Sequence, residues 1–261
     1  MTELVGIIGG TGIYNAGMLE NPQKVVLDTP YGQVILNKGR LHDKEVVFIA
    51  RHGEGHTVPP HLVNYRANIW SLKILGVKAI LAMAAVGSLS TDLKPGEIVL
   101  VNQFLDFTRS RPQTFQEKEV LHLDMTAPYC THLRRLLAVT TKQLELACHY
   151  GGTYVCTEGP RYETPAETRM YRSLGGDVIG MTGIPEAVLA REAGICYAAI
   201  ALITNFAAGI SSMRALSHNE VVDTVTRNAV KVNALLQKTI EVLDLSRACS
   251  CQESLTRGEP A

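Results

Sequence analysis

Two sets of side chains in this sequence could bind and transform a small molecule. The first set offers hydroxyls, a cation, an imidazole and backbone N–H donors at Thr11, Arg51, His52, the Ala84-Ala85 turn and Thr182. An arginine carries a planar fork of donors that fits an oxyanion. The set therefore favours inorganic phosphate as a ligand, with a solvated arginine and a plain tight turn at Thr11 as the alternatives.

The second set, Tyr162, Glu163, Asn205 and His218, suits a heterocycle attached to a sugar. An aromatic ring can stack on a base, a carboxylate accepts hydrogen bonds, and an amide both donates and accepts them. For Glu163, the alternative is a charged residue that flanks the start of a helix.

The stretch from Gly180 to Gly209 is expected to position several of these side chains. The loop at Met181–Thr182 enters a helix that Gly194 ends, and Ile195–Ile203 is an almost continuous apolar run. Such a run is typical of a strand buried on both faces, and ligands bind beside the carboxyl ends of such strands. Asn205 follows at that end, so we expect it in the site.

Three helix starts can be read from acidic residues near polar caps. Glu186 lies in the first turn of the helix after Thr182, where it either compensates the helix dipole or serves the site. Thr164 with Glu167, and Ser217 with Glu220, have the spacing of a capping box.

The amino-terminal strand and a later one each end in residues that suit an anion. Leu4–Ile8 leads into Gly9-Gly10-Thr11-Gly12, but Asn15 stands where a dinucleotide fingerprint needs its third glycine. Val46–Ile49 leads to Arg51 and His52, and glycines between His52 and His56 argue against a helical metal pair. We expect no metal site.

The remaining pattern is that of an α/β protein. Thr108–Val120 is polar and aperiodic, which predicts a surface loop or lid. Strands are predicted at Val25–Leu27, Val34–Leu36, Val77–Ala85 with a turn at Val86-Gly87-Ser88, Ile98–Phe104 and Thr153–Thr157, and helices after Pro60, over Leu133–Leu146 and after Ser217.

Composition narrows the class of protein. The 261 residues suit one large domain, predicted as 1–245 with a loose polar tail at 246–261. Lys+Arg and Asp+Glu both number 25, so no global attraction to nucleic acid or membrane is expected. The absence of a signal-like or membrane-spanning run predicts a cytoplasmic protein with reduced cysteines. Cys249 and Cys251 are either a redox pair or two exposed thiols.

Several motifs together resemble the purine nucleoside phosphorylase and methylthioadenosine phosphorylase family. They are GGTG, ARHG, VNYRANIW, EGPRYET, GMTGIPEAVLAREAGICYA and ITN, spread from about Gly6 to Leu243. The resemblance implies one α/β domain around a mixed, partly barrel-like sheet flanked by helices. It also implies trimers or dimers of trimers, and reversible phosphorolysis of an N-glycosidic bond with inorganic phosphate as co-substrate and no cofactor.

The resemblance also assigns roles to individual residues. Phosphate would contact Thr11, Arg51, His52, the Ala85 amide and Thr182, while Met181 would lie by the ribose and Tyr162 against base or sugar. Ala84 departs from the family pattern, because relatives often carry a hydroxyl or amide there.

Substrate choice follows from hydrogen bonding. Methylthioadenosine enzymes place aspartates at the positions of Asn205 and Ala207 and a small residue at that of Glu163. Here the Asn205 amide can serve O6 and protonated N7, and Glu163 can accept the N1–H of a 6-oxopurine. His218 matches the histidine that bonds a 5′-hydroxyl. These matches favour inosine and guanosine, with Asn205 and His52 as the catalytic residues.

Three alternatives stay open. A methylthioinosine or methylthioadenosine phosphorylase would differ in the 5′ group or the base. A nucleoside hydrolase would use water instead of phosphate, and the set around Arg51 speaks against it. A nucleotide-binding regulatory domain would bind without turnover, which the incomplete glycine fingerprint does not favour.

Overall fold

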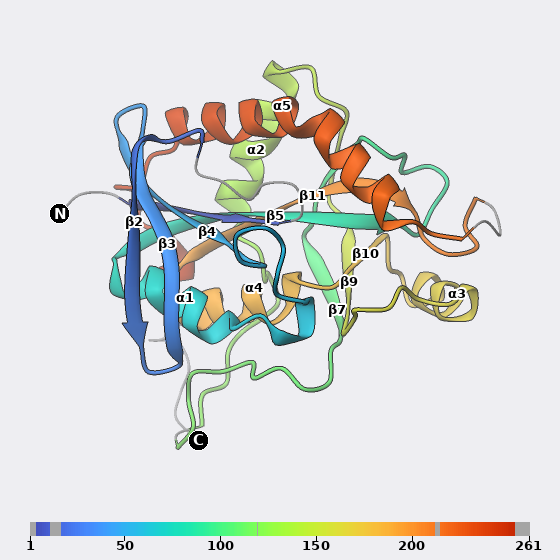
Figure 1. The fold of residues 1–261 in the computed structure, drawn as a ribbon, viewed down its shortest axis with the longest axis horizontal. Coiled ribbons are helices and arrows are strands. Elements are labelled where there is room, and N and C mark those ends of the chain that lie inside the picture. Colours follow the sequence, from blue (N-terminus) through green and yellow to red (C-terminus); the bar gives the residue numbers. More distant parts are fainter. Residues whose placement is uncertain (1–3, 11–16, 119, 212–214, 254–261) are drawn as a thin grey trace.

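The computed structural model describes residues 4–10, 17–118, 120–211 and 215–253 of the chain. Within them the strands form one mixed sheet with helices against it (Figure 1). The strands are β1 (Leu4–Gly9), β2 (Glu20–Thr29), β3 (Gly32–Leu41), β4 (Lys44–Ala50), β5 (Val77–Ser88), β6 (Ile98–Leu100), β7 (Gln103–Phe107), β8 (Cys148–Tyr150), β9 (Thr153–Thr157), β10 (Val178–Gly180) and β11 (Cys196–Phe206). The helices are η1 (Pro60–Leu62), α1 (Tyr65–Ile74), α2 (Thr131–Gln143), α3 (Pro165–Ser173), α4 (Gly183–Glu192), α5 (His218–Val242) and η2 (Ser250–Glu253).

The sheet branches at β5. Its main path runs β2-β3-β4-β1-β5-β10-β9-β7, while β11 leaves this path by pairing with β5 and then with β6. The strands β4, β1, β5 and β11 are mutually parallel, so their carboxyl ends lie at one edge. β10 runs antiparallel to the end of β5, which brings the entry of α4 to the same edge.

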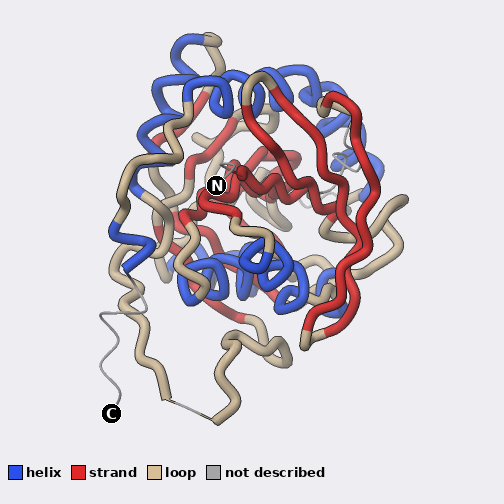
Figure 2. The backbone as a smooth tube through the Cα atoms, turned by 90° about the vertical axis from the view of Figure 1, so that its left-hand side faces the viewer, coloured by secondary structure: helices blue, strands red, loops and turns tan. Residues whose placement is uncertain are grey.

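Helices cover both faces of the sheet (Figures 1 and 2). α1 and α4 lie on one face and bury Ile69, Leu72 and Leu189 in a common apolar layer. α2 and α5 lie on the other, where Leu137 and Leu235 join a second layer. Strands buried on both faces need such cover, which explains the continuous apolar runs of β5 and β11. No helix in the described ranges is long and apolar enough to cross a membrane.

Most predicted elements are confirmed, including β11, β9, the helix ended by Gly194 and the capping box of Thr164 and Glu167 at α3. The turn predicted at Val86-Gly87-Ser88 is wrong, because β5 continues to Ser88 to pair with β10. The single strand predicted over Ile98–Phe104 is two strands, β6 and β7.

One further prediction, about the start of α5, is corrected. Ser217 is the N-cap of α5 but makes no capping hydrogen bond with its side chain, so the second capping box is wrong. The tail predicted to be loose from residue 246 is exposed at most of its described positions, with one buried exception. Cys251 in η2 is buried in the same apolar layer as α2 and α5.

Candidate active site

The carboxyl ends of the parallel strands open into a cavity of about 450 Å³. Gly10 follows β1, Arg51 and His52 follow β4, Ala85 lies near the end of β5, and Asn205 lies near the end of β11. Residues from four separated segments thus meet because their strands share one direction. The cavity lies at the edge of the sheet where the site is predicted.

Nine of the eleven predicted site residues line this cavity. They are Arg51, His52, Ala85, Tyr162, Glu163, Met181, Thr182, Asn205 and His218. Thr11 lies outside the described residues. Ala207 does not line the cavity: it is buried against Leu89 and Ile179 and borders a neighbouring cavity instead. Ala84, whose departure from the family pattern was noted, is also buried.

Arg51 is held by a buried carboxylate. Its Nε donates to Glu186 Oε1 at 2.8 Å, Nη2 donates to Oε2 at 2.7 Å, and Nη1 donates to the Met83 carbonyl at 2.7 Å. Burial alone would lower the pKa of Arg51, but the Glu186 carboxylate outweighs it and raises that pKa. The Tyr197 hydroxyl also donates to Glu186. Glu186 is therefore the partner of Arg51, and the dipole interpretation is not needed.

This pairing changes the expected electrostatics of the anion site. Three of the five guanidinium N–H groups are used, which leaves two to reach a ligand. The positive charge of Arg51 is already balanced by Glu186, so an anion here is bound by oriented donors rather than by an unpaired cation. Gly10 lets the chain that follows β1 pass close to the Met83 carbonyl, because a Cβ at this position would lie 2.7 Å from the carbonyl oxygen.

His52 is fixed as a neutral ring. Its Nδ1 lies 2.8 Å from the Val58 carbonyl, which can only accept, so Nδ1 carries the proton. Burial, followed by the charge of Arg51, lowers the pKa of His52 to about 4. In the neutral ring Nε2 is left as an acceptor. His52 stacks on His56, whose ring is 5.7 Å from that of His218, so a line of imidazoles runs to the cavity mouth.

The entry of α4 is organised around Tyr154. The N–H groups of Thr182 and Gly183 donate to the Tyr154 hydroxyl at 3.2 and 3.3 Å. A Cβ at Gly180 would lie 2.3 Å from that hydroxyl, so glycine is required for this approach. The Thr182 amide, expected to face an anion, is thus already engaged, and so is the Gly183 amide. Thr182 still lines the cavity and keeps its predicted place.

Arg111 fastens the loops around the site. Its Nη1 donates to the carbonyls of Met181 and Ile184, and its Nη2 donates to that of Glu158. The side chain is 7% exposed, and Phe115 in the same segment is buried too. The segment predicted as a surface loop or lid has no helix or strand among its described residues, as expected, but Arg111 and Phe115 anchor it inside the protein.

The outer part of the cavity holds the residues predicted to recognise the base. Burial, and after it the charge of Glu167, raises the pKa of Glu163. None of the described residues donates a side-chain hydrogen bond to the Glu163 carboxylate. Tyr162 lies beside it and is also partly buried, which raises the pKa of its phenol. A ligand N–H would therefore find a carboxylate that has a backbone hydrogen bond but no side-chain donor among the described residues.

Asn205 is oriented by its neighbours. The Thr204 hydroxyl donates to Asn205 Oδ1 at 2.8 Å, and Nδ2 donates to the Phe206 carbonyl at 2.9 Å. The Phe206 carbonyl can only accept, so this contact places the nitrogen of the amide, whereas the single proton of the Thr204 hydroxyl is shared between Asn205 Oδ1 and the Val86 carbonyl at 3.1 Å. One hydrogen of Nδ2 and one lone pair of Oδ1 stay available, which fits a two-way contact with a heterocycle.

Comparison with known proteins identifies the family. The family model described as "Phosphorylase superfamily" matches residues 4–241. The chain belongs to this family. The predicted resemblance and the α/β fold with a mixed sheet are thereby confirmed.

Relatives of this phosphorylase carry more than one substrate name. It is 52% identical over 254 residues to a probable 6-oxopurine nucleoside phosphorylase of Dictyoglomus turgidum, with 96% of each chain covered. It is 48% identical over 256 residues to a probable S-methyl-5′-thioinosine phosphorylase of Methanothermobacter thermautotrophicus, covering 97% of this chain and 89% of the other. The methylthioadenosine phosphorylase from Schistosoma mansoni in complex with adenine matches with a TM-score of 0.91 at 34% identity, covering 98% and 96%.

Sequence reasoning missed two residues that support the site, Tyr154 and Arg111, and it left the role of Glu186 open between the helix dipole and the site. Glu186 left a usable signal, because a carboxylate between Ile184 and Ala187 on a helix buried on most sides needs a partner. Tyr154 and Arg111 left no signal in the sequence, since an aromatic residue in a buried strand usually packs in the core and an arginine in an aperiodic loop is usually solvated.

Proposed function

We propose that the protein is a purine nucleoside phosphorylase that cleaves 6-oxopurine nucleosides, inosine and guanosine, to free base and ribose 1-phosphate. It is a pentosyltransferase, as the family and the names of its relatives support. The proposal includes inorganic phosphate as co-substrate and no cofactor.

One observation supports 6-oxopurines over 6-aminopurines as the base of the substrate. The Glu163 carboxylate and the Asn205 amide line one cavity, and both keep hydrogen-bonding capacity for a ligand. A 6-oxopurine offers N1–H to the carboxylate and O6 with protonated N7 to the amide. A 6-aminopurine has no N1–H, so its N1 lone pair would face the lone pairs of Glu163. A site built for one pattern rejects the other because buried polar groups are left unpaired.

The reaction follows from the placement of the two ligands. Phosphate lies by Arg51, His52 and Thr182, and one of its oxygens bonds to the anomeric carbon as the bond from that carbon to purine N9 breaks. The electron pair of that bond leaves with the purine, which takes a proton at N7 from solvent, while the proton of the monoprotonated phosphate is released to solvent. Charge on the leaving base is stabilised by Asn205, whose orientation is set before the substrate arrives. No covalent intermediate with the protein is needed.

His52 and His218 complete the proposal. The Nε2 lone pair of neutral His52 accepts from the hydroxyl of monoprotonated phosphate, which selects that ionic form. At the mouth His218 bonds the 5′-hydroxyl of the ribose, which favours inosine over 5′-methylthioinosine. The alternative, a phosphorylase of methylthioinosine, keeps the same base and differs only in this contact.

Assembly is also part of the proposal. A trimer, or a dimer of trimers, is supported by the family resemblance and by large apolar side chains that stay exposed in one chain, such as Leu62 and Val230. Light scattering coupled to size exclusion distinguishes these states from a monomer.

The deciding experiment is product analysis. Purified protein is incubated with inosine in the presence and absence of phosphate, and base and sugar products are separated by chromatography. Hypoxanthine and ribose 1-phosphate should form in equal amounts and only with phosphate. Free ribose formed without phosphate would make the protein a hydrolase, and tight binding without product would make it a regulatory domain.

A further inference from the structure

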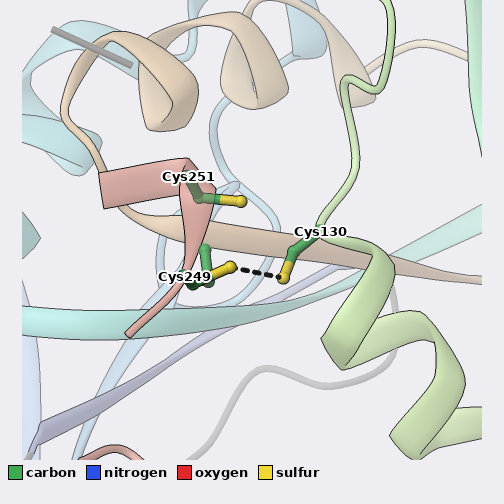
Figure 3. A group of neighbouring side chains, drawn as sticks. Cys130, Cys249 and Cys251 are labelled. Carbon is green, nitrogen blue, oxygen red and sulfur yellow. Dashed lines mark hydrogen bonds between the residues drawn. The ribbon is translucent and has the colours of Figure 1, made fainter. Parts of the chain in front are cut away.

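Four cysteines from three separated segments meet away from the cavity that Arg51, Glu163 and Asn205 line, which is called the nucleoside cavity below. Cys130 is the N-cap of α2, Cys196 is the first residue of β11, and Cys249 and Cys251 lie in the carboxyl-terminal segment. All four sulfur atoms lie within 4.8 Å of one another. Figure 3 shows Cys130 and Cys249 facing each other, with Cys251 beside them. None of the four lines the nucleoside cavity.

The spacing of the sulfur atoms fits a tetrahedral ion. The Sγ atoms of Cys130 and Cys249 are 3.8 Å apart. Zinc binds thiolate sulfur at about 2.3 Å, so two ligands of a tetrahedral site are about 3.8 Å apart. All remaining pairs are within 4.8 Å, which exceeds that spacing by about 1 Å at most. Buried cysteines often serve as small apolar side chains, but that role does not require four sulfur atoms to converge on one point.

The charge around the cluster favours thiolates. Cys130 stands at the N-terminus of α2, where unpaired backbone N–H groups and the helix dipole stabilise a negative sulfur. The adjoining cavity of about 250 Å³ is lined by Cys130, Cys249 and Cys251 together with Arg135, Arg191 and Arg247. No carboxylate is among its described lining residues. The arginines can offset the two net negative charges of a divalent ion held by four thiolates.

Access and burial also suit a structural metal. Cys130, Cys196 and Cys251 are buried in the apolar layer of α2 and α5, while Cys249 is only half-buried and faces the cavity. An ion can therefore enter from one side and be enclosed by protein on the others, with no open position for a substrate.

We propose that Cys130, Cys196, Cys249 and Cys251 form a structural zinc site that fastens the carboxyl-terminal segment to α2 and β11. Binding releases four protons from the thiols to solvent and leaves four zinc–sulfur bonds with no change of oxidation state. The site is independent of the phosphorolysis proposed above.

The test uses the full chain, reduced with a phosphine, loaded with Zn²⁺ and freed of excess metal by gel filtration. Mass spectrometry of the metal content should find about one zinc per chain. The double variant Cys249→Ser/Cys251→Ser should lose it, while Cys148→Ser, which removes a half-buried cysteine outside the cluster, should retain it. Phosphorolysis of inosine, measured in parallel, confirms that each variant is folded.

A second measurement needs no variant. Co²⁺ loaded into the reduced protein should give the sulfur-to-cobalt charge-transfer absorption and the intense visible bands of a tetrahedral thiolate site. Failure of the reduced protein to retain either metal overturns the proposal, whether the thiols then prove to be unmodified or joined in disulfides on exposure to air. Retention of zinc by the double variant equally overturns it.

Discussion

The two halves of the nucleoside cavity differ in burial and in how their side chains are hydrogen-bonded. The inner half, formed by Arg51, His52 and Thr182, is buried, and backbone groups or buried side chains fix each of its members. The outer half, formed by Tyr162, Glu163 and His218, is partly open, and Glu163 accepts no side-chain hydrogen bond from the described residues. The side chains of the inner half are held in place before any ligand binds, whereas those of the outer half keep hydrogen-bonding groups that only a ligand would use.

This difference separates stability from selectivity. Changes in the inner half should disturb the fold as well as the reaction, because they leave buried groups unpaired. Changes in the outer half should alter which nucleoside is used and leave the fold nearly intact. Asn205 shares features of both halves. Its amide is oriented by Thr204 and Phe206, and it keeps one donor and one acceptor for a ligand.

The largest effect is expected from Glu186→Ala. It leaves the Arg51 charge buried without its partner, which typically costs about 3–5 kcal/mol of unfolding free energy. Urea unfolding followed by circular dichroism measures the loss. The matched control is Glu241→Gln, which breaks an exposed pair with Lys238 and should leave the free energy of unfolding nearly unchanged. Equal losses in the two variants would contradict the inner-half account.

Asn205→Ala should leave the fold intact and slow the reaction. Removing one preorganised donor to developing charge costs about 2.7–4 kcal/mol of barrier, or about 10²–10³ in kcat. Steady-state release of hypoxanthine from inosine is the measurement. A change of only a few-fold would show that Asn205 does not stabilise the leaving base.

Glu163→Gln tests the outer half. A hydrogen bond to a charged group contributes about 1.5–3 kcal/mol, so kcat/KM for inosine should fall roughly 10- to 150-fold. Adenosine has no N1–H, so its kcat/KM, which is expected to be low already, should not fall further in this variant. The ratio of the two rates therefore isolates the base contact from general damage. An equal fall on both nucleosides would mean that Glu163 serves the fold instead.

The neutral state of His52 predicts a pH dependence of stability. The folded pKa of about 4 lies below the ordinary 6.5, so the unfolded chain binds a proton that the folded chain does not. Stability from this group is complete above pH 6.5 and is lost as the pH falls toward 4, by up to about 1.4 kcal/mol per pH unit. His52→Gln should remove that slope. An unchanged slope in urea unfolding between pH 6.5 and 4 would assign it to other groups.

The smallest effect is expected from His218→Leu, because His218 is exposed at the mouth of the cavity. Loss of a neutral hydrogen bond to the 5′-hydroxyl costs about 0.5–1.5 kcal/mol. The variant should lose roughly 2- to 12-fold in kcat/KM for inosine and improve on 5′-methylthioinosine. An unaltered ratio between these two substrates would remove His218 from the sugar pocket.

The sequence predicted the edge of the sheet at which the site lies because apolar runs followed by polar residues mark the carboxyl ends of buried strands. It also assigned Arg51, His52, Glu163 and Asn205 to one cavity, which the structure confirms. It could not show that Glu186 neutralises Arg51, since the two are 135 residues apart and their contact depends on how β4 and α4 pack.

The errors have related causes. Val86-Gly87-Ser88 looks like a turn locally, but β10 pairs with that segment and keeps it extended. Ala207 follows the predicted strand exit, yet its side chain turns toward Leu89 and away from the nucleoside cavity. The convergence of four cysteines could not be predicted, because cysteine spacing alone does not reveal that Cys130 and Cys196 lie near Cys249 and Cys251.

The most direct test of the two-halves account is a comparison of kcat/KM for inosine, 5′-methylthioinosine and 5′-methylthioadenosine on the unmodified protein, each with and without phosphate. The account predicts strictly phosphate-dependent cleavage with inosine preferred and methylthioadenosine the poorest substrate. Preference for methylthioinosine would overturn the role of His218 alone. Preference for methylthioadenosine would contradict the assignment of Glu163 and Asn205 to a 6-oxopurine, and with it the central claim.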